Sequence, residues 1–443
     1  MRVRTRWFFI PAIIICIGIS TGILCQAKVY IDINSPSFQK YPIAVTPFRN
    51  QGTRTDTENL STFFTDRLSS ALDITGYFKI IDIAGVPESE RGGDPRSGAI
   101  DFSRWSQAGA DLLVKGGFEV TGGVLTAEFR LFDVVEGRLI AGKKYWGKPG
   151  DAGMMVMKFA REILLLLTGQ GGVFDTKIAF VGKKAGRSEI YSINFDGSGL
   201  QTHSAFNSLT LFPHWTPDGK YLSFTSYKGG NPDCYLMNME SGKVETIANF
   251  KGLNLAGPWS TDGARELLVL SRDGNEEIYI WEREARELRR VTNNSAIDVS
   301  PVWSPDTGKI AFVSNRSGTP QIFVMSARGE NIRRLTFEGS YNTSPAWSPA
   351  GGRIAFEGMT NGHFQLFLID EDGSNFMQLT FEKDNCESPG WSPDGRYIAF
   401  TMKKGAAAQL AIIGSNGMNL RVLNSLDAAM SYDDPSWSSH ILY

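Results

Sequence analysis

The side chains able to carry metal or nucleophilic chemistry are few, and their spacing does not suit it. The chain has four histidines, His203, His214, His363 and His440, and none has the HExxH or Cys-His spacing typical of zinc sites. No GxSxG nucleophile elbow, Walker loop or GxGxxG dinucleotide unit occurs. The sequence therefore argues against metal-dependent, serine and nucleotide-dependent enzymes, and we expect no cofactor.

Polar residues that recur before tryptophans are a better candidate for function. A proline stands two residues before the Trp in Pro213, Pro301, Pro345, Pro389 and Pro435. The segments leading into these motifs carry Asp298, Asn342, Thr343, Glu387, Asp433 and Asp434. If these segments gather in space, they form an acidic, polar rim that can recognise a partner or ligand. The alternatives are ordinary solvation of loops, and a cation held by the rim of a hydrolase.

The tryptophans follow a repeat that must position these residues. Trp215, Trp259, Trp303, Trp347 and Trp391 are spaced 44 residues apart, and Trp437 follows 46 residues later. The surrounding text recurs, as in VWSPDTGKIAFVS and GWSPDGRYIAFTM. A second series has the same period, with Ile190, Cys234, Ile278, Ile322, Leu366 and Leu410. A period of 40–45 residues is typical of β-propeller blades.

Each repeat unit reads as four short strands joined by Asp-Gly, Ser-Gly or Asn-Gly turns. Residues 177–205 hold three strands without a preceding Trp strand, whereas DDPSWSSHILY supplies a Trp strand without followers. These two fragments add up to one blade. We therefore predict a six-bladed propeller over residues 171–443, closed by the C-terminal strand, with the rim residues around one mouth of its channel.

Residues 28–170 lack the repeat and predict a separate α/β domain. Strands are expected at 29–34, 42–48 and 77–83, followed by a short helix near 101–110 and three hairpin-linked strands over 110–148. Residues 56–72 and 151–168 have the apolar spacing of amphipathic helices, and Asp151 is a candidate N-cap. The Gly-rich segment 169–172 is the expected linker.

The first 27 residues read as a secretory signal peptide. Three arginines precede an apolar run from Trp7 to Leu24, and Cys25-Gln26-Ala27 ends it with small residues. An uncleaved anchor and a lipid attached to Cys25 are the alternatives. The full chain has a net charge of −2, and without this segment it is three units more negative. The chain is thus no basic nucleic-acid-binding protein, and the product is expected to be exported and not membrane-spanning after cleavage.

Two cysteines remain after that cleavage. Cys234 takes a position held by Ile or Leu in the other repeats, so we expect a buried, unbridged side chain. Cys386 is expected in a loop, too far along the ring for a disulfide with Cys234. The segment IDEDGSNF (369–376) faintly resembles a calcium loop, but the equivalent segments of other repeats favour a plain hairpin turn.

The chain resembles the TolB family of periplasmic proteins, because it combines a signal peptide, a small α/β domain and six WSPDG-type blades in that order. The segment KVYIDINSPSFQKYPIAVTPF and the terminal DPSWS add to the resemblance, which covers essentially the whole chain. It implies a non-enzymatic role in the Tol-Pal envelope system, which supports outer-membrane integrity and constriction at division. Two alternatives are a hydrolase that holds a metal ion in the propeller channel and a glycan-binding propeller.

The resemblance also implies two protein partners. Family members bind the lipoprotein Pal at the channel mouth, which falls here on the rim residues given above. They bind TolA through the N-terminal domain and the mature N-terminus, which falls on Lys28, Val29, Tyr30, Ile31, Asp32, Ile33 and Asn34. Apolar and polar residues alternate in this segment, so it could pack on the protein or be presented to a partner as an added strand.

Overall fold

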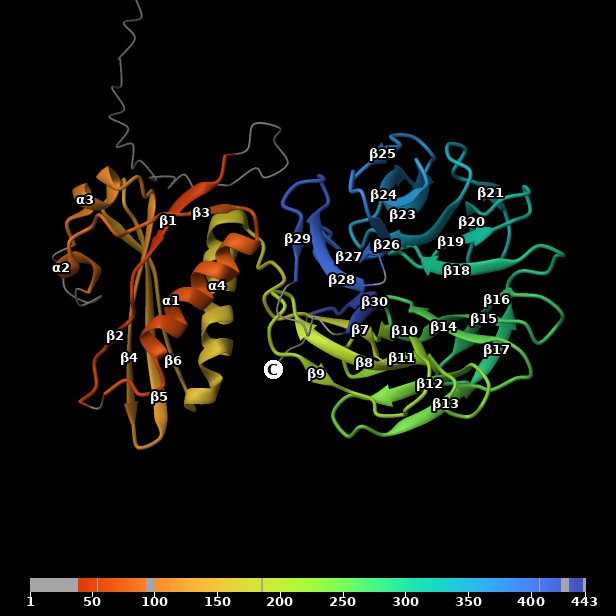
Figure 1. Cartoon of the computed structure of the whole chain (residues 1–443), viewed down its shortest axis with the longest axis horizontal. Helices are drawn as coiled ribbons and strands as arrows, with labels where there is room; N and C mark the ends of the chain where they lie inside the picture. The colour runs from red at the N-terminus through yellow and green to blue at the C-terminus, as the bar shows by residue number, and fades with distance from the viewer. Residues whose placement is uncertain are drawn as a thin grey trace, which may run out of the picture.

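The structure is a computed structural model that describes residues 39–53, 55–92, 100–184, 186–405, 407–423 and 430–440. The segment expected as a signal peptide, the strand expected at 29–34 and the partner-binding residues 28–34 lie outside the described residues. Two bodies stand side by side, an α/β domain and a propeller (Figure 1).

The α/β domain is one twisted sheet with helices on both faces. Its sheet has the order β3-β1-β4-β5-β6, and β2 extends the pairing with β4. Helices α1 and α4 lie on the side of the sheet that faces the propeller, and α2 and α3 on the other side (Figure 1). The elements are β1 (Tyr41–Val45), β2 (Arg49–Asn50), α1 (Leu60–Ile74), β3 (Phe78–Ile80), α2 (Glu88–Arg91), α3 (Phe102–Gln107), β4 (Leu112–Thr121), β5 (Val124–Asp133), β6 (Arg138–Gly147), the 3₁₀ turn η1 (Pro149–Asp151) and α4 (Ala152–Thr168).

The two long helices, α1 and α4, form where the apolar spacing predicts them. Local hydrogen bonds and one glycine determine where they begin and end. The carboxylate of Asp56 accepts hydrogen bonds from the N–H groups of Leu60 and Ser61 (2.8 and 2.9 Å), so α1 begins four residues later than expected. Asp151 is the N-cap of α4, but its carboxylate instead accepts from the Lys148 N–H at 2.7 Å. Gly169 ends α4 at φ 76°, which a glycine adopts without strain.

The remaining strands form six four-stranded blades, as the repeat predicts. We number them from the blade that contains the first repeat strand. Blade 1 is β30 (Ser431–Trp437), β7 (Lys177–Lys184), β8 (Arg187–Asn194) and β9 (Gln201–Thr202); blade 2 is β10 (Thr210–Trp215), β11 (Tyr221–Ser226), β12 (Asp233–Asn238) and β13 (Val244–Ala248); blade 3 is β14 (Asn254–Trp259), β15 (Arg265–Leu270), β16 (Glu277–Glu282) and β17 (Glu287–Arg290). Blade 4 is β18 (Asp298–Trp303), β19 (Lys309–Ser314), β20 (Gln321–Ser326) and β21 (Arg333–Arg334); blade 5 is β22 (Asn342–Trp347), β23 (Arg353–Thr360), β24 (His363–Asp370) and β25 (Met377–Gln378); blade 6 is β26 (Asn385–Trp391), β27 (Tyr397–Lys404), β28 (Ala407–Gly414) and β29 (Arg421–Val422).

The Trp strands are the inner strands of the ring. Each of β10, β14, β18, β22, β26 and β30 contacts the Trp strand of the next blade, and β30 returns to β10. The ring closes where β30 pairs antiparallel with β7. At this seam the Trp437 indole N–H donates to the Thr176 hydroxyl (2.8 Å), and the Lys177 N–H donates to the Ser438 hydroxyl (2.9 Å). Closure by the C-terminal strand is therefore confirmed.

Both cysteines among the described residues, Cys234 and Cys386, are free and buried. Cys234 lies on β12 in the apolar packing between blades 2 and 3, as expected. Cys386 is not in a loop, because it is the second residue of β26 and packs against Leu366, Leu368 and Ile413 in the core between blades 5 and 6. The sequence expectation for Cys386 was wrong because its strand begins one residue before it.

The α/β domain rests on the turns at one end of blades 6 and 1. The Tyr397 hydroxyl donates to the Thr75 carbonyl (2.8 Å), and the Arg421 guanidinium pairs with Asp73 (2.7 Å). On the blade 1 side, Arg67 of α1 pairs with Asp196 at 2.9 Å. Tyr397 and Arg421 directly follow turns between the first and second or the third and fourth strands of a blade, and Asp196 lies within a turn of the latter kind. The inner strands begin at the opposite end, so the predicted mouth faces away from the α/β domain.

Among the helices that the structure describes, none is both long enough and apolar enough to cross a membrane.

Candidate functional site

The strict repeat lets equivalent positions be compared around the mouth of the channel. The first inner-strand position shared by all six blades is buried, with side chains at most 2% exposed. Its members are Thr210, Asn254, Asp298, Asn342, Cys386 and Tyr432. Two of the predicted rim residues, Asp298 and Asn342, therefore point into the blades.

Both residues are fully engaged by neighbours inside the propeller. Asp298 accepts two hydrogen bonds from the Arg316 guanidinium (3.0 and 2.8 Å) and one from Asn294 (2.7 Å). The Asn342 amide donates to Gln321 Oε1 and to the Glu338 carbonyl, each at 2.8 Å. These contacts tie each strand start to the preceding loop and to the hairpin formed by the second and third strands of blade 4, so the two residues position the mouth.

The next position divides the ring into two halves. Blades 2, 3 and 4 place apolar residues there, and we call them the apolar half. Blades 5, 6 and 1 place polar or charged residues there, and we call them the charged half. In order around the ring the residues are Leu211, Leu255, Val299, Thr343, Glu387 and Asp433. Three predicted rim residues thus lie together in the charged half.

The third position has an unusual backbone. Five residues there have φ between 50° and 54°, in the left-handed region that non-glycine residues rarely adopt. They are Phe212, Ser300, Ser344, Ser388 and Asp434, and each stands before the repeated proline. Every inner strand has a register shift at this place, where it is bulged against its neighbour. The bulge re-aims the side chain, as is common at binding sites.

The two halves also differ in the hairpin formed by the second and third strands. These strands have six residues each in the apolar half and eight in the charged half. In blade 5 the connection is a two-residue Asn361-Gly362 turn with positive φ at both positions, which favours a tight hairpin. In blades 2 and 4 the same stretch contains Pro232 or Pro320, which have no N–H for pairing.

The longer hairpins bring lysines to the inner strand. Lys183 at the end of β7 pairs with Asp433 at 2.8 Å, and Lys403 on β27 forms an ion pair with Glu387. The Thr401 hydroxyl also donates to Asp433, at 3.1 Å. Although burial acts to raise the pKa of Asp433, the hydrogen bond and charge of Lys183 hold that pKa below its ordinary value. Asp433 therefore stays ionised.

Two further carboxyl groups in this network lack a lysine of their own. Glu357 of β23 is buried and accepts from the Ser388 N–H at 2.7 Å, while the Ser388 hydroxyl donates to Asp434 at 3.2 Å. Burial raises the pKa of Glu357 to about 7. Burial and then the charge of Asp433 raise the pKa of Asp434. The charged half thus joins blades 5, 6 and 1 through a network that responds to pH near neutrality.

Sequence reasoning missed Glu357, although the repeat could have found it. Its equivalents in the other blades are Val181, Thr225, Val269, Val313 and Thr401, so a carboxylate there breaks the pattern. A second exception is Glu266 in blade 3, whose equivalents are all Ile or Leu. Glu266 is fully buried, and among the described residues neither carboxyl oxygen has a hydrogen-bond partner, although Ser223 and the Gly257 N–H lie nearby. Burial raises its pKa to about 8.

The loops that lead into the inner strands add exposed apolar side chains to the same end of the propeller. These residues were not singled out from the sequence because isolated exposed apolar residues are common. They are Leu209 (39% exposed), Ile297 (43%), Phe337 (74%), Tyr341 (39%) and Phe381 (77%). Leu209 and Ile297 lead into blades 2 and 4 of the apolar half, whereas Phe337, Tyr341 and Phe381 lead into blades 5 and 6, so exposed apolar side chains also stand beside the charged half.

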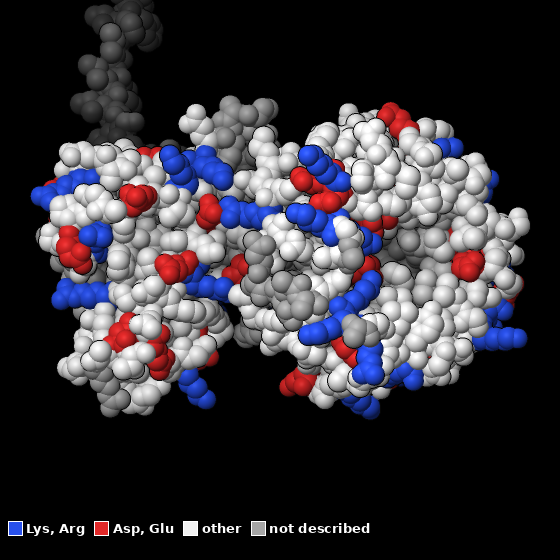
Figure 2. Space-filling view, viewed as in Figure 1, with Lys and Arg blue, Asp and Glu red and all other residues white. Residues whose placement is uncertain are grey.

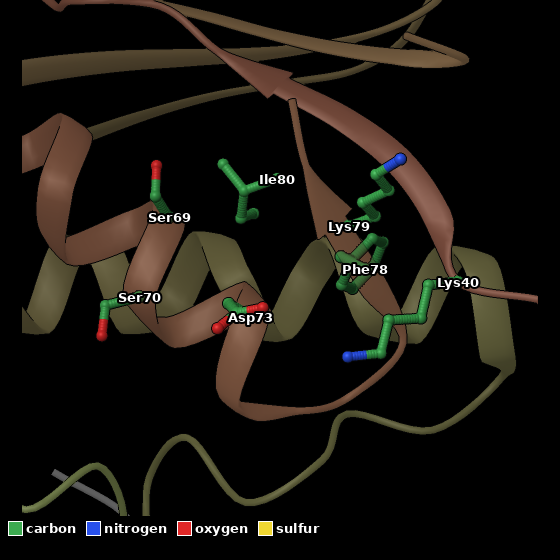
Figure 3. Close-up of a pocket in the computed structure, with 7 residues that line it drawn as sticks. All are labelled: Lys40, Ser69, Ser70, Asp73, Phe78, Lys79 and Ile80. Atoms are coloured by element: carbon green, nitrogen blue, oxygen red, sulfur yellow. The ribbon is translucent and has the colours of Figure 1, made fainter. Parts of the chain in front are cut away.

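A second candidate region is a surface pocket on the α/β domain (Figure 3). The pocket has a volume of about 510 Å³ and lies between α1 and β3. Its lining residues are Lys40, Ser69, Ser70, Asp73, Phe78, Lys79 and Ile80. Lys40 precedes β1, so the chain enters the described structure at the side of this pocket.

Within the described ranges no three or more His, Cys, Asp and Glu side chains are grouped so that they could hold a metal ion. Figure 2 shows basic and acidic side chains interspersed over the visible face of both domains. This mixture matches the near-neutral net charge of −2.

Models of known protein families match both domains of the chain. A family model described as "TolB beta propeller domain" matches residues 165–441, and one described as "TolB amino-terminal domain" matches residues 29–140. The chain is similar to the crystal structure of TolB from Acinetobacter baumannii, with a TM-score of 0.77 and 26% identity over 90% of this chain and 97% of that one.

Curated relatives match over a shorter stretch. The Tol-Pal system protein TolB of Syntrophus aciditrophicus is 46% identical over 205 residues, which is 44% of each protein. The protein of the same name from Desulfosudis oleivorans is 37% identical over 220 residues, or 49% of each. The chain thus spans about half the length of the curated relatives it matches.

Proposed function

Because the chain belongs to the TolB family, we propose that it is a non-enzymatic, periplasmic component of the Tol-Pal system. In this role it binds Pal through the propeller mouth and TolA through its N-terminal region, and it supports outer-membrane integrity and envelope constriction during division. The proposal rests on the relatives named Tol-Pal system protein TolB and on the form of the mouth.

The division of the mouth into two halves is the observation that carries the Pal assignment. A protein interface typically combines an apolar centre with polar groups that fix orientation. Here the apolar groups are Leu211, Leu255 and Val299. The polar groups are Glu387 and Asp433. The mouth also lies at the end of the blades opposite the α/β domain, so a partner can reach it. Asp298 and Asn342 act by holding the strand starts in place.

The TolA assignment falls on Lys28–Asn34, with the α/β domain behind it. Asn34 is six residues before Lys40, and six residues span about 20 Å at most. The segment can therefore reach the pocket of Figure 3 or leave it for a partner. The exposed lysines Lys40 and Lys79 and the α1 hydroxyls give the pocket polar groups for an extended segment such as VYIDIN.

Calorimetric titration with purified Pal tests the first assignment. We expect charge reversal at the rim, Glu387→Lys combined with Asp433→Lys, to weaken Pal binding by at least about tenfold, because both the charge pattern and the ion pairs are lost. Asp372→Lys, on an exposed turn at the other end of blade 5, is the matched control and should bind Pal as the unmodified protein does. Circular dichroism and thermal melting establish that the propeller is folded. Unchanged affinity in a folded double variant would refute the rim assignment.

Removal of residues 28–34 tests the second assignment. We expect this deletion to weaken TolA binding while Pal binding stays intact or becomes stronger. The control replaces the segment by a Gly-Ser linker of equal length, which keeps the chain length but removes the alternating apolar residues. TolA affinity equal to that of the full chain in both variants would contradict the assignment.

A further inference from the structure

Strand β6 leaves one side of the α/β sheet open. It pairs with β5 from Leu125↔Gly147 to Asp133↔Arg138, and within the described ranges no strand pairs with its other side. The opposite edge, β3, has only three residues, whereas β6 has ten. A long free edge presents a row of unpaired backbone N–H and C=O groups, and proteins usually protect such an edge.

The apolar residues of β6 divide between two faces. Ala141 and Tyr145 pack toward the core shared with α4. Trp146 points the other way, directly beside Thr126 of β5, and is 68% exposed. Val124, at the start of β5 and on the same face as Thr126, is 49% exposed. A tryptophan this exposed beside a free strand edge is typical of a binding hot spot.

The charge on β6 selects what can pair with it. The strand carries Arg138, Lys143 and Lys144, Lys148 follows it, and no acidic residue lies on it. Lys143 pairs with Glu162 of α4 (3.0 Å). Lys144 stands opposite Glu128, but Glu128 pairs with Arg130 at 2.6 Å. A second copy of β6 would bring lysines against lysines, so this edge disfavours self-pairing.

We propose that β6 is a docking edge for an extended, acidic segment of a protein partner, which adds to the sheet as an extra strand beside residues 141–147. The backbone of the added strand pairs with the free side of β6. Its acidic side chains lie near Lys144 and Lys148, and an apolar side chain covers Trp146. The register shift between Leu131 and Phe132, opposite Leu139–Ala141, limits regular pairing to this C-terminal stretch. This surface is distinct from the propeller mouth and from residues 28–34.

Fluorescence anisotropy with labelled seven-residue peptides tests the proposal on the full chain. We expect a peptide of alternating Glu and Val to bind with a dissociation constant of about 0.1–1 mM. A peptide of alternating Lys and Val, and a Glu-Val peptide with a central Pro that blocks strand pairing, should bind at least about tenfold more weakly. Hydrogen exchange should show slower exchange at β6 amides when the acidic peptide is bound.

Four variants define the site. Trp146→Ala and Lys144→Glu should each weaken binding of the acidic peptide by about tenfold, because each removes one of the two recognised features. Phe63→Ala on α1 and Lys158→Glu on α4 remove an exposed aromatic and an exposed lysine elsewhere, and should leave binding unchanged. Three outcomes would each overturn the proposal: equal binding of acidic and basic peptides, wild-type binding by Trp146→Ala, or no binding of the acidic peptide.

Discussion

Blades 2, 3 and 4 have the same period and strand order as blades 5, 6 and 1, yet the two halves offer different chemistry at the mouth. In the apolar half, Leu211, Leu255 and Val299 occupy the position that carries Thr343, Glu387 and Asp433 in the charged half. The longer hairpins of the charged half add Lys183 and Lys403. The repeat therefore sets the backbone, whereas single positions and turn types decide which chemical groups each blade presents at the mouth.

The largest effect is expected at the ion pair between Asp298 and Arg316 in the apolar half. Asp298→Ala leaves the Arg316 guanidinium without its carboxylate, and Asp298 is fully buried. We expect the free energy of unfolding to fall by about 3–5 kcal/mol, measured by urea denaturation. Asp433→Ala in the charged half should cost less, because its partner Lys183 is 38% exposed and can be hydrated. If both variants lose the same free energy of unfolding, the two halves do not differ in how much they depend on these ion pairs.

Glu266→Leu should make the apolar half more stable. Its folded pKa of about 8 lies above the ordinary value of 4.5. Below pH 4.5 the carboxyl group is protonated in both the folded and the unfolded state, so its ionisation does not lower the free energy of unfolding. As the pH rises toward 8, only the unfolded state ionises freely, so stability is lost. We expect a gain of a few kcal/mol (about 2–4) at pH 8 that shrinks toward pH 4.5, measured by denaturation at several pH values.

Glu266→Gln is the matched control, because it removes the charge but keeps a buried polar group. It should show the same pH trend with a smaller gain. A gain from Glu266→Leu that does not depend on pH would contradict the ionisation argument.

Lys403→Met tests the charged half and should have a smaller effect. It leaves Glu387 without its ion pair and removes a charge that lowers the pKa of Glu357. Lys403 is 35% exposed, so we expect a loss of about 1–2 kcal/mol. A higher folded pKa at Glu357 removes stability as the pH rises, so the loss should be greater at pH 8 than at pH 5. Lys404→Met, at the exposed neighbouring residue, is the control, and a similar loss there would count against the network.

The smallest effect is expected at the seam of blade 1. His440 Nδ1 lies 2.6 Å from Asp175, and its hydrogen bond to Asp175 raises the pKa of His440. The stabilisation is present below pH 6.5 and is lost as the pH rises through the raised value. His440→Gln should lower the stability by less than about 1 kcal/mol at pH 5.5, because the pair is partly exposed, and by nothing measurable at pH 9. If the loss of stability in His440→Gln instead grows as the pH rises, the ion pair with Asp175 is not its cause.

The blade architecture could be predicted from the sequence because one pattern recurs six times. Each WSPDG-type turn and each alternating strand supports the others, so an error in one unit is corrected by the rest. The α/β domain was predicted from single segments, and there the limits are visible. The α1 start moved to Leu60 because Asp56 caps from a distance, a contact that spacing alone does not show.

The candidate site was predictable only in part. The sequence places Asp298, Asn342, Glu387 and Asp433 near one mouth, but it cannot show that the first two are turned into the blades. Direction depends on the bulge before each proline, which shifts the strand register by one residue. The exceptions Glu357 and Glu266 were open to detection by aligning the repeats, because each replaces residues that are apolar or uncharged in every other blade.

The α/β domain bridges the place where the ring is closed. Tyr397 and Arg421 belong to blade 6 and Asp196 to blade 1, and the contacts of α1 and its C-terminal end reach both sides. Apolar packing is also continuous from α4 through Phe174 to Ile178, Ala399 and Leu410. Detaching the domain and opening the ring thus expose the same surfaces. We expect the two bodies to melt as one cooperative unit, with a single calorimetric transition whose enthalpy corresponds to the whole molecule.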